Sequence, residues 1–307
     1  MKSPKIGNLI ELPHAIREDR LTLLRACKPK YLLMVDRKQA PLAIVTGSNQ
    51  GIGYEIVKIF LKQNLRTVLT YRNVDHGTEA LNALKGQEDF DQSNLFHHQL
   101  DITDQKSIQM FRDWVIESFG PQSVSILVNN AGIAFKSRDP TPFAQQTAPT
   151  LGTNTYSTMN FTDLMIPLLT PLGARIVFVA SQSGLSALNR MSKALQTRWQ
   201  SPSLSRQDIY FMLNEFQTAV LQGNHQTLGW PDSNYGVSKL AVITLAKALA
   251  CVLPESQPNT RVYSCCPGYC ATNMSSFQGQ LHTSIVEFSF FVCLSLSLCS
   301  IIYIYIY

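Results

Sequence analysis

The chain has few of the residues that build metal sites, disulfide frameworks or nucleic-acid surfaces. Its seven cysteines have neither the pairing of a disulfide framework nor the spacing of a zinc site, and its six histidines include no H-x-x-x-H pair. Only 15% of the residues are charged, and residues 1–40, with nine Lys/Arg and four Asp/Glu, account for the whole net charge of +5. The neutral remainder excludes a basic face for nucleic acid. We expect reduced thiols, no metal and a cytoplasmic location.

Residues 1–40 form an N-terminal extension that we expect to be disordered and without chemistry. The extension lacks the compact apolar segment of a secretory signal, and its acidic residues argue against a transit peptide. Met34 is an alternative start, because a chain beginning there runs directly into the first expected strand.

Residues 41–277 alternate short apolar runs with segments of helix length. The expected strands are Leu42–Thr46, Arg66–Tyr71, Asn94–Leu100, Val124–Val128, Arg175–Ala180 and Arg261–Cys266, and the clearest expected helices are Gly51–Gln63, Ser107–Phe119 and Gln207–Leu221. Strands this apolar are typical of a parallel sheet that is buried on both faces. The sequence predicts one α/β domain with a doubly wound parallel sheet and a ligand crevice at the carboxyl ends of the strands.

A glycine-rich loop, TGSNQGIG at 46–53, lies between the first strand and the first helix. Gly47 permits a tight turn, Gly51 lets the backbone approach a pyrophosphate, and Gly53 lets the helix pack against the strand. The start of the helix then offers free N–H groups to phosphate. The spacing is G-x-x-x-G-x-G, so an ordinary glycine-rich turn is the alternative, although the strand–turn–helix context favours dinucleotide binding.

The end of the second strand indicates which dinucleotide binds. The strand ends with Tyr71-Arg72, and the first acidic residue after it is Asp75. An acidic residue at this point binds the ribose of NAD, whereas a cation accommodates the 2′-phosphate of NADP. Arg72 presents a planar guanidinium to phosphate, with an ordinary surface arginine as the alternative. The sequence predicts NADP.

Tyr235-Gly-Val-Ser-Lys239 places a phenol and an ammonium four residues apart, on one face of a helix. A lysine beside a tyrosine favours the phenolate and lowers the phenol's pKa from its usual ~10. Such a tyrosine is a suitable proton donor for carbonyl reduction after hydride delivery. The pair alone is weak evidence, because this spacing arises by chance on many helices.

Taken together, the motifs resemble the short-chain dehydrogenase/reductase family, and within it the monomeric carbonyl reductases that use NADPH. The resemblance runs from Pro41 to Met274 and rests on TGSNQGIG at 46–53, LDITD at 100–104, LVNNAGIAF at 127–135, PTPF at 140–143, GWP at 229–231, YGVSK at 235–239 and CCPG at 265–268. It implies a Rossmann fold and NADPH-dependent reduction of ketones, aldehydes or quinones to alcohols.

The resemblance also implies the site residues. Ser181 would donate a hydrogen bond to the substrate carbonyl, and Tyr235 would protonate it. Lys239 would bind the nicotinamide ribose and lower the pKa of Tyr235, while Asn154 would fix a helix backbone and a water in the proton relay. The implied cofactor-binding set is Gly47, Asn49, Gly51, Ile52, Gly53, Arg72, Asp101, Ile102, Asn130, Ala131, Gly132, Tyr235, Lys239, Pro267, Gly268 and Thr272.

The segment between the two catalytic hydroxyls is long, since Tyr235 lies 54 residues after Ser181. By resemblance, an insertion over 186–231 would cover the helix face through which other family members associate, so a monomer is expected. The same insertion would shape one wall of the substrate cleft, with Trp230 and Tyr269 as candidate aromatic lining.

Two departures from the family pattern stand out. Gln50 occupies a position where the family often has a lysine for the 2′-phosphate, which weakens the preference for NADP. After Phe277 the resemblance stops, and residues 278–307 form an atypical apolar tail in place of the family's last helix and strand.

The tail sets the alternatives for function and location. Residues 284–307 are long enough to span a membrane, but apolar residues alternating with Ser or Tyr suit a strand better. A membrane anchor is the alternative location. Without the family's last strand, the strand Arg261–Cys266 becomes an open edge unless the tail pairs with it. The alternative function is a catalytically impaired variant that binds dinucleotide or misfolds.

Overall fold

The computed structural model describes residues 8–11, 40–87, 89–136, 138–257, 259–268, 270–272, 274–275, 279 and 302–305. Its strands form one sheet, in which every described pairing between strands is parallel. The strands are β1 Asn8–Glu11, β2 Leu42–Val45, β3 Arg66–Tyr71, β4 Leu95–Gln99, β5 Val124–Asn129, β6 Arg175–Val179, β7 Arg261–Cys266 and β8 Ile302–Tyr305.

Helices connect these strands. They are α2 Gly51–Lys62, α3 Val74–Lys85, α4 Gln105–Phe119, α5 Phe143–Leu151, α6 Thr158–Met165, α7 Gln182–Arg190, α8 Lys193–Trp199, α9 Arg206–Leu221 and α10 Asn234–Ser256. A π-helix, η5 Gly152–Ser157, joins α5 to α6, and the 3₁₀ turns η4 Gln92–Asn94 and η6 Ile166–Leu168 precede β4 and β6. The predicted strands and helices are all present, with ends that differ by at most two residues.

Local sequence explains where several helices begin and end. Asp104 caps α4 by accepting a hydrogen bond from a backbone N–H of its first turn, and Gly120 follows its last residue with φ 85°. At α9, Ser205 and Asp208 form a capping box, in which each side chain accepts from the other's backbone N–H. These signals act within one turn and are independent of the rest of the fold.

The strand order creates the crevice that the sequence predicts. The order is β1-β8-β7-β6-β5-β2-β3-β4, so the chain winds outward from β2 in one direction through β3 and β4 and then in the other through β5, β6 and β7. The direction reverses between β2 and β5. In doubly wound sheets, ligands bind outside the carboxyl ends of the strands at this reversal. The predicted Rossmann fold is confirmed.

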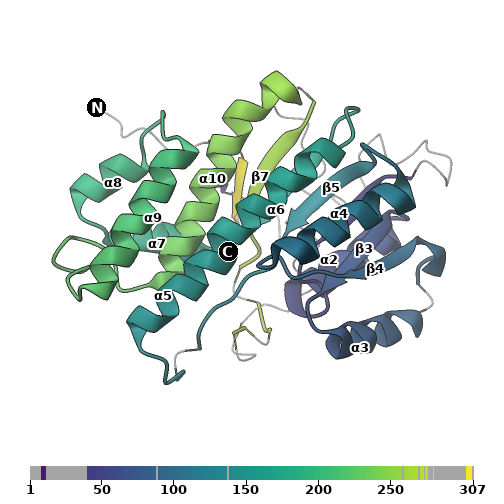
Figure 1. Cartoon of the computed structure of the whole chain (residues 1–307), viewed down its shortest axis with the longest axis horizontal. Helices are drawn as coiled ribbons and strands as arrows, with labels where there is room; N and C mark the ends of the chain where they lie inside the picture. Colours follow the sequence, from purple (N-terminus) through teal and green to yellow (C-terminus); the bar gives the residue numbers. More distant parts are fainter. Residues whose placement is uncertain are drawn as a thin grey trace.

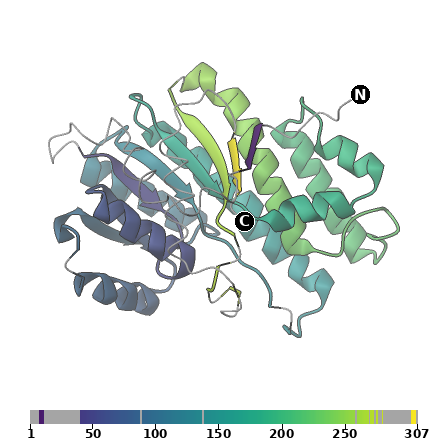
Figure 2. The same cartoon turned by 180° about the vertical axis from the view of Figure 1, so that it is seen from behind.

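Two hydrophobic clusters cover the two faces of the sheet (Figures 1 and 2). One cluster contains Ala43 and Val45 of β2 and packs beneath α2 and α3. The other contains Leu42 and Ile44 of the same strand and packs beneath α4, α6 and α10. Because successive strand residues point to opposite faces, an uninterrupted apolar strand supplies both clusters.

The segment between Ser181 and Tyr235 includes α8, which lies against α7, and α9, which lies against α5 and α10, at one end of the molecule (Figure 1). Arg206 of α9 makes an ion pair with Asp163 of α6 through both guanidinium nitrogens. Tyr156 of η5 donates to Asn214 Oδ1 at 3.2 Å and packs against Tyr210, with 5.0 Å between ring centroids. The insertion therefore covers the outer face of α5, η5 and α6.

Both ends of the chain contribute a strand to the same sheet edge (Figure 2). In the tail, Ile302–Tyr305 is a strand, as the alternating pattern favoured, and it pairs with Tyr263–Cys266 of β7. Asn8–Glu11 in turn pairs with β8. These four residues differ from the disordered extension that the sequence predicted, because the outer edge of β8 offers backbone groups that an extended segment can satisfy. The remaining predictions for residues 1–40 and 278–307 fall mostly on residues outside those described.

Within the described part of the chain, one helix is long and apolar enough to cross a membrane. This segment, Asn234–Leu253, has a mean hydropathy of 1.8, and 72% of its apolar window is buried inside the protein. Its burial between the sheet, α5 and α7 accounts for its composition, since a helix that is hydrophobic all round is also typical of a protein core.

We predict that a chain truncated after Phe277 melts at least about 4 °C lower and self-associates. Removing β8 exposes the backbone groups of β7, and each kcal/mol lost lowers the melting temperature of a domain this size by about 2–4 °C. Thermal unfolding and size-exclusion chromatography with light scattering measure both effects. A chain that ends at Tyr305 retains β8 and serves as the control. Equal melting temperatures and masses would show that β8 does not protect the edge.

Candidate active site

The glycine-rich loop packs tightly against the end of β5. Gly47 and Gly51 have φ of 58° and 59°, in the left-handed region that favours glycine. A Cβ on Gly47 would lie 3.0 Å from Ala131 Cα, and a Cβ on Gly53 would lie 2.4 Å from Asn130 Nδ2. The predicted roles of these glycines as a turn and as a close helix contact agree with this geometry.

Hydrogen bonds fix the loop in this position. Asn130 Nδ2 donates to the carbonyl oxygens of Thr46 and Gly47, both at 2.9 Å. The backbone N–H groups of Asn130 and Ala131 donate to Thr46 Oγ1, each at 2.9 Å, and Gly47 N–H donates to Thr70 Oγ1 at 3.0 Å. Three adjacent strands are thereby tied together where their carboxyl ends meet.

The start of α2 is suited to an anion. Gln50, the residue before the helix, makes no capping hydrogen bond with its side chain, and the first turn holds no acidic residue. The first N–H groups of a helix have no partner within it and lie at the positive end of the helix dipole. A phosphate is a natural ligand for such an end.

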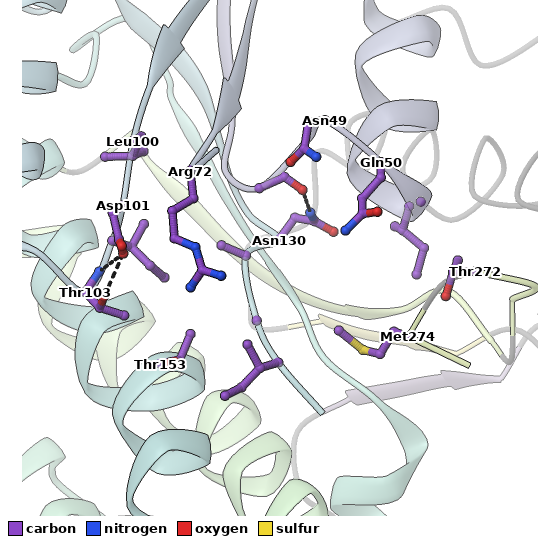
Figure 3. A pocket seen from close by; sticks show the side chains of 17 residues that line it. Asn49, Gln50, Arg72, Leu100, Asp101, Thr103, Asn130, Thr153, Thr272 and Met274 are labelled. Atoms are coloured by element: carbon purple, nitrogen blue, oxygen red, sulfur yellow. Dashed lines mark hydrogen bonds between the residues drawn. The ribbon is translucent and has the colours of Figure 1, made fainter. Parts of the chain in front are cut away.

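A pocket of about 280 Å³ opens above this loop (Figure 3). Eleven of the predicted cofactor residues line it: Gly47, Asn49, Gly51, Ile52, Arg72, Asp101, Ile102, Asn130, Ala131, Gly132 and Thr272. The sequence prediction did not include the lining residues Gln50, Leu100, Thr103, Ile133, Thr153 and Met274. Gly53, Tyr235, Lys239, Pro267 and Gly268 do not line this pocket, and the last two directly follow β7.

Arg72 lies between Asp101 on one side and Asn49 and Gln50 on the other (Figure 3). Gln99 of β4 donates to the Arg72 carbonyl at 2.9 Å and so fixes its backbone. The Asp101 carboxylate accepts from both the N–H and the hydroxyl of Thr103. The exposed guanidinium is therefore placed to meet a phosphate entering beside the loop.

The Ser181 and Tyr235 hydroxyls meet where α7 and α10 cross. A Cβ on Gly184 would lie 2.7 Å from the backbone nitrogen of Leu240, and a Cβ on Gly236 would lie 3.0 Å from a backbone carbonyl of α7. This close approach brings Ser181, which caps α7, to the phenol of Tyr235 in the first turn of α10. The two side chains share a hydrogen bond, which acts to lower the pKa of Tyr235.

Burial dominates the protonation of Tyr235 and Lys239. It raises the pKa of Tyr235 to about 12, against the opposing hydrogen bond from Ser181. It lowers the pKa of Lys239 to about 8, with a smaller opposing effect of Cys266. The Lys239 ammonium donates to the Val179 carbonyl at 2.8 Å and lies 5.7 Å from the centre of the Tyr235 ring.

The sequence predicted that Lys239 lowers the pKa of Tyr235. In the structure, the pKa of Tyr235 is raised instead. Burial removes the phenolate from water, and desolvation penalises this charged form. It raises the pKa of Tyr235 more than the hydrogen bond from Ser181 lowers it. The lysine is itself disfavoured as a cation by the same burial.

Asn154 links the loop after β5 to α10 from within the π-helix η5. Its Oδ1 accepts from Ile133 N–H at 2.7 Å, and its Nδ2 donates to Ile133 O at 2.9 Å and to Ser238 Oγ at 3.0 Å. Ser238 in turn donates to the backbone carbonyl of Tyr235 at 2.8 Å. Ser238 is absent from the sequence prediction, although its place three residues after Tyr235, one helical turn away, is a usable signal.

Trp230 does not have the position that the sequence predicted. It is 5% exposed and packs on Phe216, with ring centroids 5.4 Å apart. It borders a cavity of about 580 Å³ between α8 and α9, together with Phe211. The large apolar ring is satisfied by the core of the insertion and does not line the cofactor pocket. Tyr269 lies outside the described residues.

Fold, glycine loop and the Ser–Tyr–Lys–Asn arrangement define a dinucleotide-dependent oxidoreductase. Residues 41–193 match the family described as short chain dehydrogenase, and the chain belongs to this family. It is 39% identical over 241 residues to carbonyl reductase (NADPH) 3 of Rattus norvegicus, covering 78% of this chain and 84% of that protein. It is 38% identical over 237 residues to carbonyl reductase (NADPH) 1 of Homo sapiens, covering 76% and 83%.

A solved structure agrees with the fold. Salutaridine reductase from Papaver somniferum superposes with a TM-score of 0.74 at 26% identity, over 86% of this chain and 99% of that one. The predicted family is thus confirmed, and the relatives' names carry the cofactor that the sequence predicts.

We predict that Gly184→Ala lowers both stability and turnover. The added methyl group meets the backbone of α10, so the helices must separate, at a cost of about 1–3 kcal/mol, and Ser181 moves away from Tyr235. Urea unfolding and steady-state kinetics measure the two effects. Gly86→Ala is the control, because its nearest contact is 3.9 Å away. Equal behaviour of the two variants would contradict the close crossing.

We predict that Lys239 makes the cofactor-free protein more stable as pH rises from about 8 towards 10.5. The folded protein releases this proton near pH 8, whereas the unfolded chain keeps it up to its ordinary pKa of 10.5. The unfolded state therefore binds more protons across this window, and stability rises with pH. Denaturant unfolding from pH 7.5 to 9.5 should show the rise relative to Lys239→Met. Tyr235 does not yet titrate in this range. Lys193→Met, at an exposed position, controls for the lost charge. Parallel pH curves for wild type and Lys239→Met would refute the assignment.

Proposed function

We propose that this protein is an NADPH-dependent carbonyl reductase that reduces ketones, aldehydes or quinones to alcohols. The observation that carries the proposal is the hydrogen-bonded approach of Ser181 to Tyr235 across the α7–α10 crossing, with Lys239 beside them. The names of the relatives support the same activity.

The residues present fit NADPH. The glycine loop and the start of α2 would hold the pyrophosphate, and Arg72, with Asn49 and Gln50 nearby, would hold the 2′-phosphate. Bound NADPH would supply the hydride for the carbonyl carbon. A glutamine at position 50 adds no charge, so the preference for NADP over NAD rests mainly on Arg72.

The protein's own groups would manage the proton and the oxygen. Tyr235, with its pKa raised to about 12, keeps its proton throughout the neutral range and so holds the proton that the carbonyl oxygen needs. Ser181 would donate a hydrogen bond to the same oxygen as negative charge develops on it. Asn154 and Ser238 would hold the backbone of Tyr235 in place.

We predict that the purified full chain oxidises NADPH in the presence of a quinone, followed by absorbance at 340 nm. Tyr235→Phe should lower kcat by at least about 100-fold, because the proton donor is lost. Tyr156→Phe, which removes a phenol bonded to Asn214, is the matched control and should change kcat less than about twofold. Arg72→Gln should raise KM for NADPH by about tenfold and leave KM for NADH unchanged.

The same protein distinguishes the alternative function. If NADPH binds but no turnover occurs with quinones or activated ketones, the chain is a dinucleotide-binding variant. If it neither binds NADPH nor unfolds cooperatively, it is a misfolded form, and the reductase proposal is wrong in either case.

We further propose a cytoplasmic monomer. The ion pair between Arg206 and Asp163 and the contacts of Tyr156 hold the insertion over the helix face that would otherwise be free for association. Light scattering on the full chain should give one chain per particle, and a dimer would contradict this.

After cell lysis the protein should remain in the supernatant, whereas sedimentation with membranes would support an anchor in the tail.

A further inference from the structure

Tyr235 lies in the first turn of its helix. It is the second residue of α10, and the N–H groups of a first helical turn have no partners within the helix. Ser233 caps this turn by accepting from Gly236 N–H at 3.0 Å. The cap fixes the path of the backbone but makes no bond to a neighbouring helix. The position of the phenol therefore depends on contacts that tie the first turn to the surrounding elements.

Asn234 makes such a tie to α5. This residue directly precedes Tyr235 and is only 5% exposed. Its Nδ2 donates to the Phe143 carbonyl at 2.9 Å, and its Oδ1 accepts from Thr147 Oγ1 at 2.8 Å. Both ends of the amide are thus used by one helix. Reversing the amide would place Oδ1 against the Phe143 carbonyl, so the network permits a single orientation.

A second tie reaches Tyr235 from the adjoining π-helix. Asn154 of η5 donates to Ser238, which donates to the Tyr235 carbonyl. Because α5 continues directly into η5, both ties come from one continuous helical segment. Asn154 holds the carbonyl side of Tyr235, and Asn234 holds its amino side.

We propose that Asn234, oriented by Thr147, is a positioning residue that keeps the Tyr235 phenol within hydrogen-bonding reach of Ser181. The inference rests on the proposed function, since it concerns the efficiency of the same proton donor. Asn234 is buried, so it acts through Tyr235 and not on the substrate. A buried amide with two directional bonds fixes the rotation of a helix end more narrowly than apolar packing does.

Thr147 and Thr150 provide a matched pair of variants. Both are buried threonines of α5 whose hydroxyls lie within hydrogen-bond distance of the carbonyl four residues earlier, and only Thr147 can instead donate its one hydroxyl hydrogen to Asn234. We expect Thr147→Val to lower kcat about 5- to 20-fold and Asn234→Ala about 10- to 100-fold. The KM for NADPH should stay within about twofold in both. Thr150→Val should change kcat less than twofold, at a similar loss of melting temperature.

A double-variant cycle separates positioning from simple destabilisation. If Asn234 acts through the phenol, Asn234→Ala should change the residual activity of Tyr235→Phe less than about twofold. An equal loss in the wild-type and Tyr235→Phe backgrounds would overturn the proposal, as would equal kcat values for the two threonine variants. An inactive wild-type enzyme would instead refute the reductase activity itself, and the positioning role with it.

Discussion

The close crossing of α7 and α10 is the contact on which the rest of the site depends. Gly184 and Gly236 have no Cβ, and added methyl groups would lie 2.7–3.0 Å from backbone atoms of the opposite helix. Only at this separation can the residue that caps one helix meet a residue in the first turn of the other. Ser181 and Tyr235 come together for this reason. Both helices start at the carboxyl ends of the strands, beside the dinucleotide pocket. Interiors packed at this density tolerate little adjustment, so the geometry of the site follows from the backbones.

Burial gives these groups their chemistry. The pKa of Tyr235 is raised because its surroundings disfavour the phenolate, and the pKa of Lys239 is lowered because the same surroundings disfavour the ammonium. On an open helix, the tyrosine and the lysine would titrate near their ordinary pKa values of 10.0 and 10.5. The anchors from Asn154 and Asn234 hold the pair in place, and the insertion covers the helices that carry those anchors.

The sequence predicted the fold well where local signals and burial agree. Apolar runs such as Arg66–Tyr71 and Arg261–Cys266 became strands with the predicted ends, because strands buried on both faces admit few polar residues. The glycine loop and Arg72 also lie at the pocket, as predicted. Trp230 did not follow its expected role, because aromatic character cannot distinguish a core position from a cleft wall. Residues 8–11 form a strand only through pairing with a segment almost 300 residues away, which no local pattern encodes.

By itself, the sequence determined the family, the α/β class and the glycine-rich loop, since each depends on residue type and short spacing. Tertiary structure alone decided the direction of the Tyr235 and Lys239 pKa shifts, because desolvation depends on everything packed around a group. It also decided that Ser238 and Asn234 support Tyr235, since their partners lie on η5 and α5, 84 to 91 residues earlier. It placed β8 against β7 as well, where the backbone groups of an open strand edge required a partner.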